Sequence, residues 1–309
     1  MLNKNYYWRK SGKGITIIKF NLKTLQLDTI YISKFFGVKE LKVSPNQEYI
    51  AFIEMAKGET ADREYSILPE NQLRILDKNG RTVKVIKEDV RRFIWSPKGN
   101  RLALIAGSYY EGGIGFKPQR LFIFDIGTDR LDSLSIKYIP YEIYWSSVGN
   151  YLYGKTLQFI EDRNIFQFNL SSQQFKWTNF KDIWFSPDEK YYVHFPDQIS
   201  YEFVLYESAT NRDITRIIPP GIGSPVRWIS NSQNYFLFKK VHSTRTGKKI
   251  GAFKIITKEV INGVTYTVFD VDNRRIVKKW EADSEAEFVG NASVIVFRKQ
   301  GKILVESFE

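Results

Sequence analysis

A short hairpin motif recurs along the whole chain, and this recurrence constrains the fold more than any other feature. In the stretch FIWSPKGNRLALIA, an aromatic strand end is followed by a polar turn and then by a strand of alternating apolar residues. The anchor of this copy, Trp95, lies seven residues before Leu102. The same step begins at six other apolar anchors, which are Trp8, Val43, Trp145, Phe185, Trp228 and Phe288.

The residues between the anchors predict two tight hairpins in each repeat. Ser-Pro opens several of the first turns, where proline presets φ at the second turn position. The strand that follows alternates as a half-buried strand does. A second strand then ends at a short polar or acidic residue, which can hydrogen-bond its own backbone two residues further along. The residues at that position are Asn21, Asp77, Asp125, Asn169, Glu207 and Asp270.

Each repeat is therefore read as four strands, A to D, with tight A–B and C–D turns. The anchors from Trp8 to Phe288 are spaced about 47 residues apart, a spacing typical of propeller blades. The sequence predicts an all-β protein, a β-propeller of four-stranded antiparallel blades. Seven blades are favoured, with six as the alternative, and the first and last copies are expected to hold three strands each. Residues 1–309 are predicted to form a single domain, because each repeat needs its neighbours to bury its faces.

Two of the turn copies, IWSPKGNRLALI and WFSPDEKYYVHF, resemble the Ser-Pro-Asp-Gly repeat of TolB-like (PD40-type) propellers. That repeat also occurs in the propellers of prolyl-oligopeptidase relatives. The C–D segments are similar to the Tyr-Asp-x-x-Thr-Gly hairpins of WD40 and YVTN-type propellers. The resemblance covers nearly the whole chain and implies an architecture rather than a function. It breaks down in the last copy, where Gly290 and Asn291 replace Ser-Pro.

The B–C connections are predicted to be the long loops of the protein. They are expected at residues 55–71, 107–119 and 239–263, on the face opposite the short turns. Long loops on a rigid scaffold are where binding residues usually lie. The candidate binding residues are the aromatic Tyr109, Tyr110 and Phe116 and the basic Lys239, Lys240, Arg245, Lys248 and Lys249.

The charge of the chain indicates the kind of partner. The formal net charge is +12, and no Asp or Glu occurs between Ile214 and Lys258. A basic surface of this kind attracts polyanions. The predicted partner is an acidic protein or another polyanion, and nucleic acid is the alternative.

The sequence lacks the usual signatures of catalysis. It contains no cysteine, and its two histidines are His194, on a predicted B strand, and His242, in the third long loop. No Gly-x-Ser-x-Gly elbow is present. Asp270–Asn273 slightly resembles the spacing of calcium ligands but coincides with a hairpin turn. We therefore predict a non-catalytic scaffold with no metal site and no cofactor. The alternatives are a propeller enzyme with a channel site and a gating propeller separated from its hydrolase.

The start of the chain bears on its compartment. The first ten residues contain no apolar signal region, and no apolar run reaches the roughly 20 residues that span a bilayer. No membrane span is expected. A cytoplasmic location follows if Met1 is the native start, and a periplasmic or extracellular one if a signal segment has been removed.

Overall fold

A computed structural model gives the fold of the chain. It describes residues 5–11, 14–21, 26–35, 37–55, 71–109, 116–160, 162–195, 203–217, 224–230, 234–250, 253–283, 287–289 and 294–307. Every regular element among these residues is a β-strand, which confirms the all-β prediction. The chain divides into two compact units, Met1–Ile183 and Trp184–Glu309. Each unit is described by itself.

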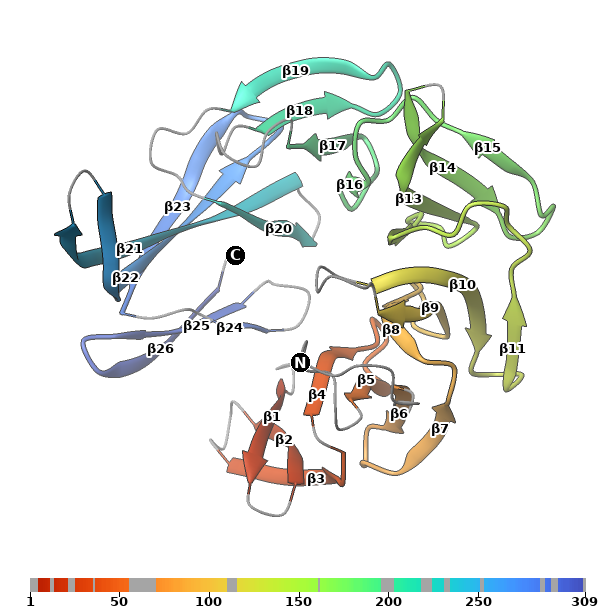
Figure 1. The fold of residues 1–309 in the computed structure, drawn as a ribbon, viewed down its shortest axis with the longest axis horizontal. Coiled ribbons are helices and arrows are strands. Elements are labelled where there is room, and N and C mark those ends of the chain that lie inside the picture. The colour runs from red at the N-terminus through yellow and green to blue at the C-terminus, as the bar shows by residue number, and fades with distance from the viewer. Residues whose placement is uncertain are drawn as a thin grey trace. The chain divides into compact units, whose positions relative to one another are not determined.

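The first unit holds four antiparallel sheets, each built from strands consecutive in the sequence (Figure 1). Its first sheet has three strands, β1 (Asn5–Ser11), β2 (Gly14–Asn21) and β3 (Gln26–Ser33). The second comprises β4 (Gly37–Val43), β5 (Tyr49–Met55), β6 (Gln72–Asp77) and β7 (Thr82–Ile86). The third comprises β8 (Val90–Trp95), β9 (Arg101–Tyr109), β10 (Phe116–Asp125) and β11 (Arg130–Ser133). The fourth comprises β12 (Glu142–Trp145), β13 (Tyr151–Ile160), β14 (Arg163–Asn169) and β15 (Phe175–Trp177).

The second unit continues the same plan with three sheets. One comprises β16 (Trp184–Phe185), β17 (Tyr191–His194), β18 (Phe203–Glu207) and β19 (Arg212–Ile217). The next comprises β20 (Ser224–Ser230), β21 (Asn234–Ile250), β22 (Phe253–Asp270) and β23 (Arg275–Ala282). The last has three strands, β24 (Glu287–Val289), β25 (Val294–Lys299) and β26 (Lys302–Ser307).

The number of complete blades differs from the prediction. The described residues form five four-stranded blades, whereas the sequence favoured seven with six as the alternative. The first and last sheets hold three strands each, as expected from the short copies at the two ends of the sequence. The repeat count therefore overstated the blades, because a turn motif marks one A–B hairpin whether or not its sheet has a fourth strand.

Consecutive sheets of a unit pack through both of their faces. In β9, Leu102 and Leu104 join a core shared with the second sheet, whereas Ala103 and Ile105 join a core shared with the fourth. All four side chains are fully buried. Neighbouring residues of a strand point to opposite faces, so a strand that is buried on both faces is apolar at most of its positions. This packing explains runs such as RLALIA.

Serine has a specific part in the A–B turns that the sequence pattern did not disclose. The hydroxyl of Ser44 accepts a hydrogen bond from the Tyr49 amide at 2.9 Å, and Ser186 accepts one from the Tyr191 amide at 3.0 Å. Ser96 and Ser146 make the equivalent bonds with Arg101 and Tyr151. In each of these turns, the serine hydroxyl therefore bonds the amide five residues later and closes the turn. This bond adds to the effect of proline in the copies that contain it.

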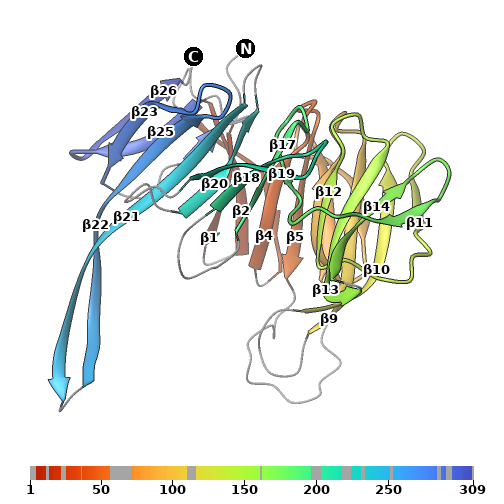
Figure 2. The same cartoon turned by 90° about the horizontal axis from the view of Figure 1, so that it is seen from above.

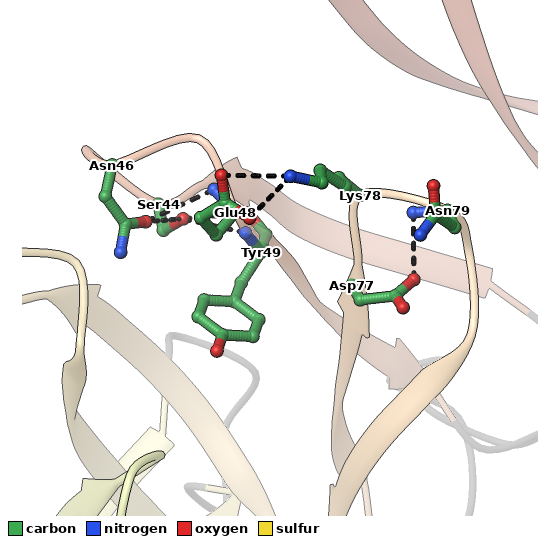
Figure 3. A network of polar contacts seen from close by, with 7 residues as sticks. All are labelled: Ser44, Asn46, Glu48, Tyr49, Asp77, Lys78 and Asn79. Carbon is green, nitrogen blue, oxygen red and sulfur yellow. Dashed lines mark hydrogen bonds and ion pairs between the residues drawn. The ribbon is translucent and has the colours of Figure 1, made fainter.

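The C–D turns confirm the predicted role of the short polar residue. Asp77 Oδ1 accepts hydrogen bonds from the amides of Asn79 and Arg81, at 2.8 and 2.9 Å. In the same sheet, the Lys78 ammonium pairs with Glu48 across the two neighbouring turns (Figure 3). Both of these side chains are exposed, and the ion pair raises the pKa of Lys78. An exposed pair of this kind adds little stability.

Tryptophan anchors bond adjacent sheets together. The Nε1 atoms of Trp95, Trp145 and Trp228 donate to the carbonyls of Lys42, Ile94 and Trp184, at 3.2, 3.2 and 2.8 Å. Each acceptor lies immediately before the anchor of the preceding repeat. The indole therefore does two things: it fills the space between sheets, and it fixes the position of one sheet against the next.

The seven-residue step corresponds to direct cross-strand pairing in most copies. Trp95 lies opposite Leu102, and Trp145 lies opposite Leu152. Two copies differ, because Trp8 pairs with Ile17 and Trp228 pairs with Phe236. The seven-residue step therefore marks the position of the hairpin in every copy. It gives the cross-strand register correctly in all copies except those of Trp8 and Trp228.

Candidate functional site

The third predicted loop is a β-ribbon, which corrects the sequence-based interpretation. Residues 239–263 were expected to form a loop, yet β21 and β22 continue through this region and pair with each other up to Ile250 and Phe253. The partner strand β20 stops pairing at Lys239, and β23 stops at Val264. Residues 240–263 form a two-stranded projection, which we call the arm, and Figure 2 shows it extending past its sheet.

The stem of the arm is exposed within the described part of the second unit. The side chains of Val241, Val260 and Ile261 have 40%, 42% and 52% of their surface exposed. Asn262 donates a hydrogen bond to the Thr244 hydroxyl across the ribbon. The stem is therefore held by its own cross-strand pairs, with aliphatic surface left in contact with solvent.

The arm is strongly basic. It carries one acidic residue, Glu259, against six basic residues, Lys240, Arg245, Lys248, Lys249, Lys254 and Lys258. Arg245 lies opposite Glu259 in the register of the ribbon. Lys249 lies opposite Lys254, so two lysine positions face each other near the end of the arm.

Two of the predicted basic residues lie at the base of the arm. Lys239 and Lys240 are half-buried, and Lys240 lies opposite Thr265 in the register. His242 is the next residue but one, and its Nε2 lies 2.7 Å from the Thr265 hydroxyl. His242 was placed in a loop by the sequence, whereas it belongs to β21. The structure brings all five predicted basic residues, Lys239, Lys240, Arg245, Lys248 and Lys249, onto this one strand.

The predicted aromatic residues belong to the first unit. The loop expected at 107–119 is shorter than predicted, because β9 extends to Tyr109 and β10 begins at Phe116. Tyr109 and Phe116 are directly opposite each other in the register. Tyr110 lies outside the described residues, as do residues 56–70 of the loop predicted at 55–71. The joint use of these aromatics and the basic arm stays a prediction.

A buried polar cluster in the first unit was missed by sequence reasoning. The Glu54 carboxylate is fully buried and accepts hydrogen bonds from Ser33 Oγ at 2.6 Å and Gln72 Nε2 at 2.6 Å. It also accepts from Tyr31 OH at 3.2 Å and from Arg74 Nε at 2.9 Å. The four donors and the arginine charge offset the cost of burying the carboxylate.

The cluster changes the acidity of its tyrosine. Burial, and then the nearby Glu54 charge, raise the pKa of Tyr31 to about 12. A signal for the cluster does exist in the sequence, since Glu54 is in phase with the buried Ile50 and Phe52 of β5. A charged residue in a buried phase requires a buried partner. The cluster joins the outer strand of the first sheet to the middle of the second.

The remaining polar candidates have structural surroundings. His194 is in β17, as predicted, and its ring lies 6.3 Å from that of Tyr206. Asp270 accepts hydrogen bonds from the Asn273 amide and side chain, at 3.0 and 2.8 Å, which is the bonding of a hairpin turn. Across the described ranges, no group of three or more His, Asp or Glu side chains could hold a metal ion. In the same ranges, no helix is long and apolar enough to cross a bilayer.

Comparison with known proteins gives structural relatives only. No protein-family model matches the chain, and no curated protein matches it in sequence. An uncharacterised protein of Listeria monocytogenes, lmo1340, is 14% identical with a TM-score of 0.56, covering 98% of this chain and 91% of that one. Hydrazine synthase of Kuenenia stuttgartiensis is 11% identical with a TM-score of 0.56, covering 99% and 92%.

TolB of Acinetobacter baumannii is also similar in structure. It is 16% identical with a TM-score of 0.50, and the match covers 92% of this chain. The chain spans 64% of the length of that TolB, so it is matched to a part of the relative. Identities this low show the fold and nothing about function. The sheets, their turns and these likenesses together establish that the chain has the fold of the TolB-like β-propellers.

Proposed function

We propose that the chain is a non-catalytic β-propeller scaffold that binds an acidic protein or another polyanion at the B–C ends of its blades. The observation that carries this proposal is the arm, a B–C connection extended into a basic ribbon. The arm carries its positive charges beyond the end of the sheet from which it extends. Exposed charges of one sign speed the encounter with an oppositely charged partner.

The geometry supports the B–C ends over the opposite ends of the blades. At the opposite ends, the A–B and C–D turns are closed by their own hydrogen bonds, such as those of Ser44 and Asp77. Such turns offer little reach. The B–C connections hold the arm and the strand ends at Tyr109 and Phe116. On this proposal the arm supplies attraction, and the aromatic residues supply contact area.

The test is the salt dependence of association with a model polyanion, polyaspartate immobilised on a surface. Reversal of Lys248 and Lys249 to Glu should slow association about tenfold and flatten its dependence on salt. The Tyr110→Ala variant should chiefly raise the dissociation rate of a protein partner. Surface binding kinetics measure both rates.

A matched control is available in the same unit. Lys299 and Lys302 are exposed and face each other at the β25–β26 turn. Their reversal to Glu changes the net charge by the same amount at another hairpin tip, and association should change much less. An equal effect of the two double variants would show that net charge, and not the arm, governs binding.

A further inference from the structure

The arm is an unusual element because a two-stranded ribbon is marginally stable in water by itself. Beyond the ends of β20 and β23, each strand of the arm pairs only with the other among the residues that the structure describes. At about 3.3 Å per residue, the ten residues from Val241 to Ile250 reach roughly 33 Å. That reach is several times the Debye length of about 8 Å at physiological salt. The tip therefore acts electrostatically apart from the sheet that carries it.

The register divides the tip into two faces of different chemistry. Ile250 is opposite Phe253, and Lys248 is opposite Ile255, so these four positions share one face. The other face holds the pair Lys249 and Lys254. Three of the four positions on the first face are apolar. Ile250 and Phe253 form the described pair nearest the turn, and Ile255 lies opposite Lys248, two residues further back. Lysines lie directly behind the apolar positions and on the opposite face.

This order of residues fits an anionic lipid surface. Apolar residues at the end of a projection can enter the boundary of the acyl chains, while lysines behind them contact lipid phosphates. The long apolar stem of lysine also lets its ammonium reach the headgroups. Lys249 and Lys254 occupy facing positions of the ribbon, and lipid phosphates supply counter-charge to two lysines so placed.

Nucleic acid fits the tip less well. Of the side chains that read base edges in the grooves, residues 246–258 contain lysine and threonine but no Arg, Asn, Gln, Asp or Glu. Single strands are held by aromatic side chains that stack on the bases, and Phe253 is the only aromatic residue in that range. Its apolar neighbours at 250, 255 and 256 are isoleucines, which have no ring to stack.

We propose that the arm binds the surface of an anionic lipid bilayer, with its apolar tip inserted and its lysines on the headgroups. This proposal rests on the proposed function, since it names the polyanion that the arm recognises. It requires no membrane-spanning segment, because the arm touches one leaflet of the bilayer. The rest of the second unit stays in water.

The experiment is vesicle co-sedimentation of the full chain with two lipid compositions. The protein should bind phosphatidylcholine vesicles that contain phosphatidylserine and should not bind pure phosphatidylcholine vesicles. The double variant Ile250→Ser, Phe253→Ser keeps the charge of the arm and should weaken vesicle binding about tenfold or more. The same variant should bind polyaspartate as the parent does.

The charge variant separates the two contributions. Lys248→Gln with Lys249→Gln should weaken vesicle binding roughly thirtyfold, since each lysine near an anionic surface contributes about fivefold. The matched control, Lys299→Gln with Lys302→Gln, removes a facing lysine pair from a hairpin tip that has no apolar residue at its turn, Gln300 and Gly301. It should leave vesicle binding nearly unchanged. Circular dichroism confirms that each variant is folded.

The outcomes separate this inference from the proposed function. Binding to polyaspartate without binding to phosphatidylserine vesicles overturns the lipid proposal and leaves the scaffold proposal standing. Binding to neither overturns both. Equal binding to neutral and anionic vesicles, or tight binding to duplex or single-stranded DNA that the serine variant retains, also overturns the lipid proposal. Self-association of the arm without lipid, abolished by the serine variant, overturns it in favour of a second copy of the chain.

Discussion

At the residue scale, a few polar side chains decide how the apolar strands are connected. Ser44 and its counterparts close the A–B turns, and Asp77 and its counterparts close the C–D turns. The buried Glu54 joins two sheets through its donors, and tryptophan nitrogens join others through backbone carbonyls. The apolar residues supply burial on both faces of a sheet, whereas these polar residues close the turns and link neighbouring sheets.

The first residue-scale prediction concerns Trp145, which is 3% exposed and donates to the Ile94 carbonyl. Trp145→Phe removes the donor and leaves that carbonyl without this bond, which should lower the free energy of unfolding by about 1–3 kcal/mol. Denaturant unfolding followed by circular dichroism measures the change. Trp177→Phe is the control, because the Trp177 indole packs on Phe166 and Phe175 without a ring-nitrogen hydrogen bond in the described structure. Equal losses would assign the effect to ring volume.

The second residue-scale prediction concerns pH. The pKa of Tyr31 is raised from 10.0 to about 12, so the folded state holds this proton more tightly than the unfolded state does. The stability from this group is complete below pH 10 and is lost as the pH rises through about 12. Tyr31→Phe should flatten that part of the stability curve by about 1 kcal/mol, after a discount for solvent screening.

The measurement is chemical unfolding of both proteins at several pH values in this window. Lysines and other tyrosines also titrate there, so the informative quantity is the difference between parent and variant. Parallel curves would contradict the assigned role of Tyr31. A difference that grows steadily as the pH falls toward 10 would support it, because the parent then regains its stability and the variant does not.

At the element scale, the arm is the part of the second unit that extends beyond the pairing of β20 and β23 with the two long strands. Strand β20 pairs with β21 as far as Lys239, and strand β23 pairs with β22 as far as Val264. The arm begins where this pairing ends. The exposed Val241, Val260 and Ile261 add aliphatic surface that burial within the described part of the unit does not remove. Apolar surface that stays exposed to solvent and does not join the core is typical of a binding site.

The element-scale prediction is that the arm can be removed without unfolding the protein. Val241 and Val264 face each other, so an Asn-Gly turn can join them in place of residues 242–263. The free energy of unfolding should change by less than about 1 kcal/mol, because an isolated hairpin is marginally stable. Thermal and denaturant unfolding measure the change. A loss of several kcal/mol would show that the arm packs against the rest of the protein and is not a free projection.

At the scale of the whole molecule, the chain joins a common architecture to an uneven charge. The net charge is +12, and six basic residues are concentrated in the 24 residues of the arm. Five four-stranded blades and two three-stranded sheets divide between two compact units. That they act as a single domain over residues 1–309 stays a prediction, as does the gathering of all B–C connections on one face.

The sequence alone determined what is local. A hairpin requires an apolar strand end, a turn residue with the right backbone preference and an alternating strand, and all three are adjacent in the chain around Trp95 and Asp77. The four-strand repeat followed from these hairpins. The basic residues of the candidate site were also identified from the sequence, because the stretch from Ile214 to Lys258 contains no Asp or Glu.

The tertiary structure decided what depends on partners far apart in the chain. The blade count depends on whether a fourth strand forms, which a turn motif does not report. The residues from Lys239 to Gly263 were read as a loop, because polar and charged residues between strands are typical of loops, yet cross-strand pairing makes them a ribbon. The Glu54 cluster draws on three strands, and the donors of its carboxylate are 18 to 23 residues away in the sequence. Hydrogen bonds and burial of this kind are set by the packing of sheets, which no single stretch of sequence contains.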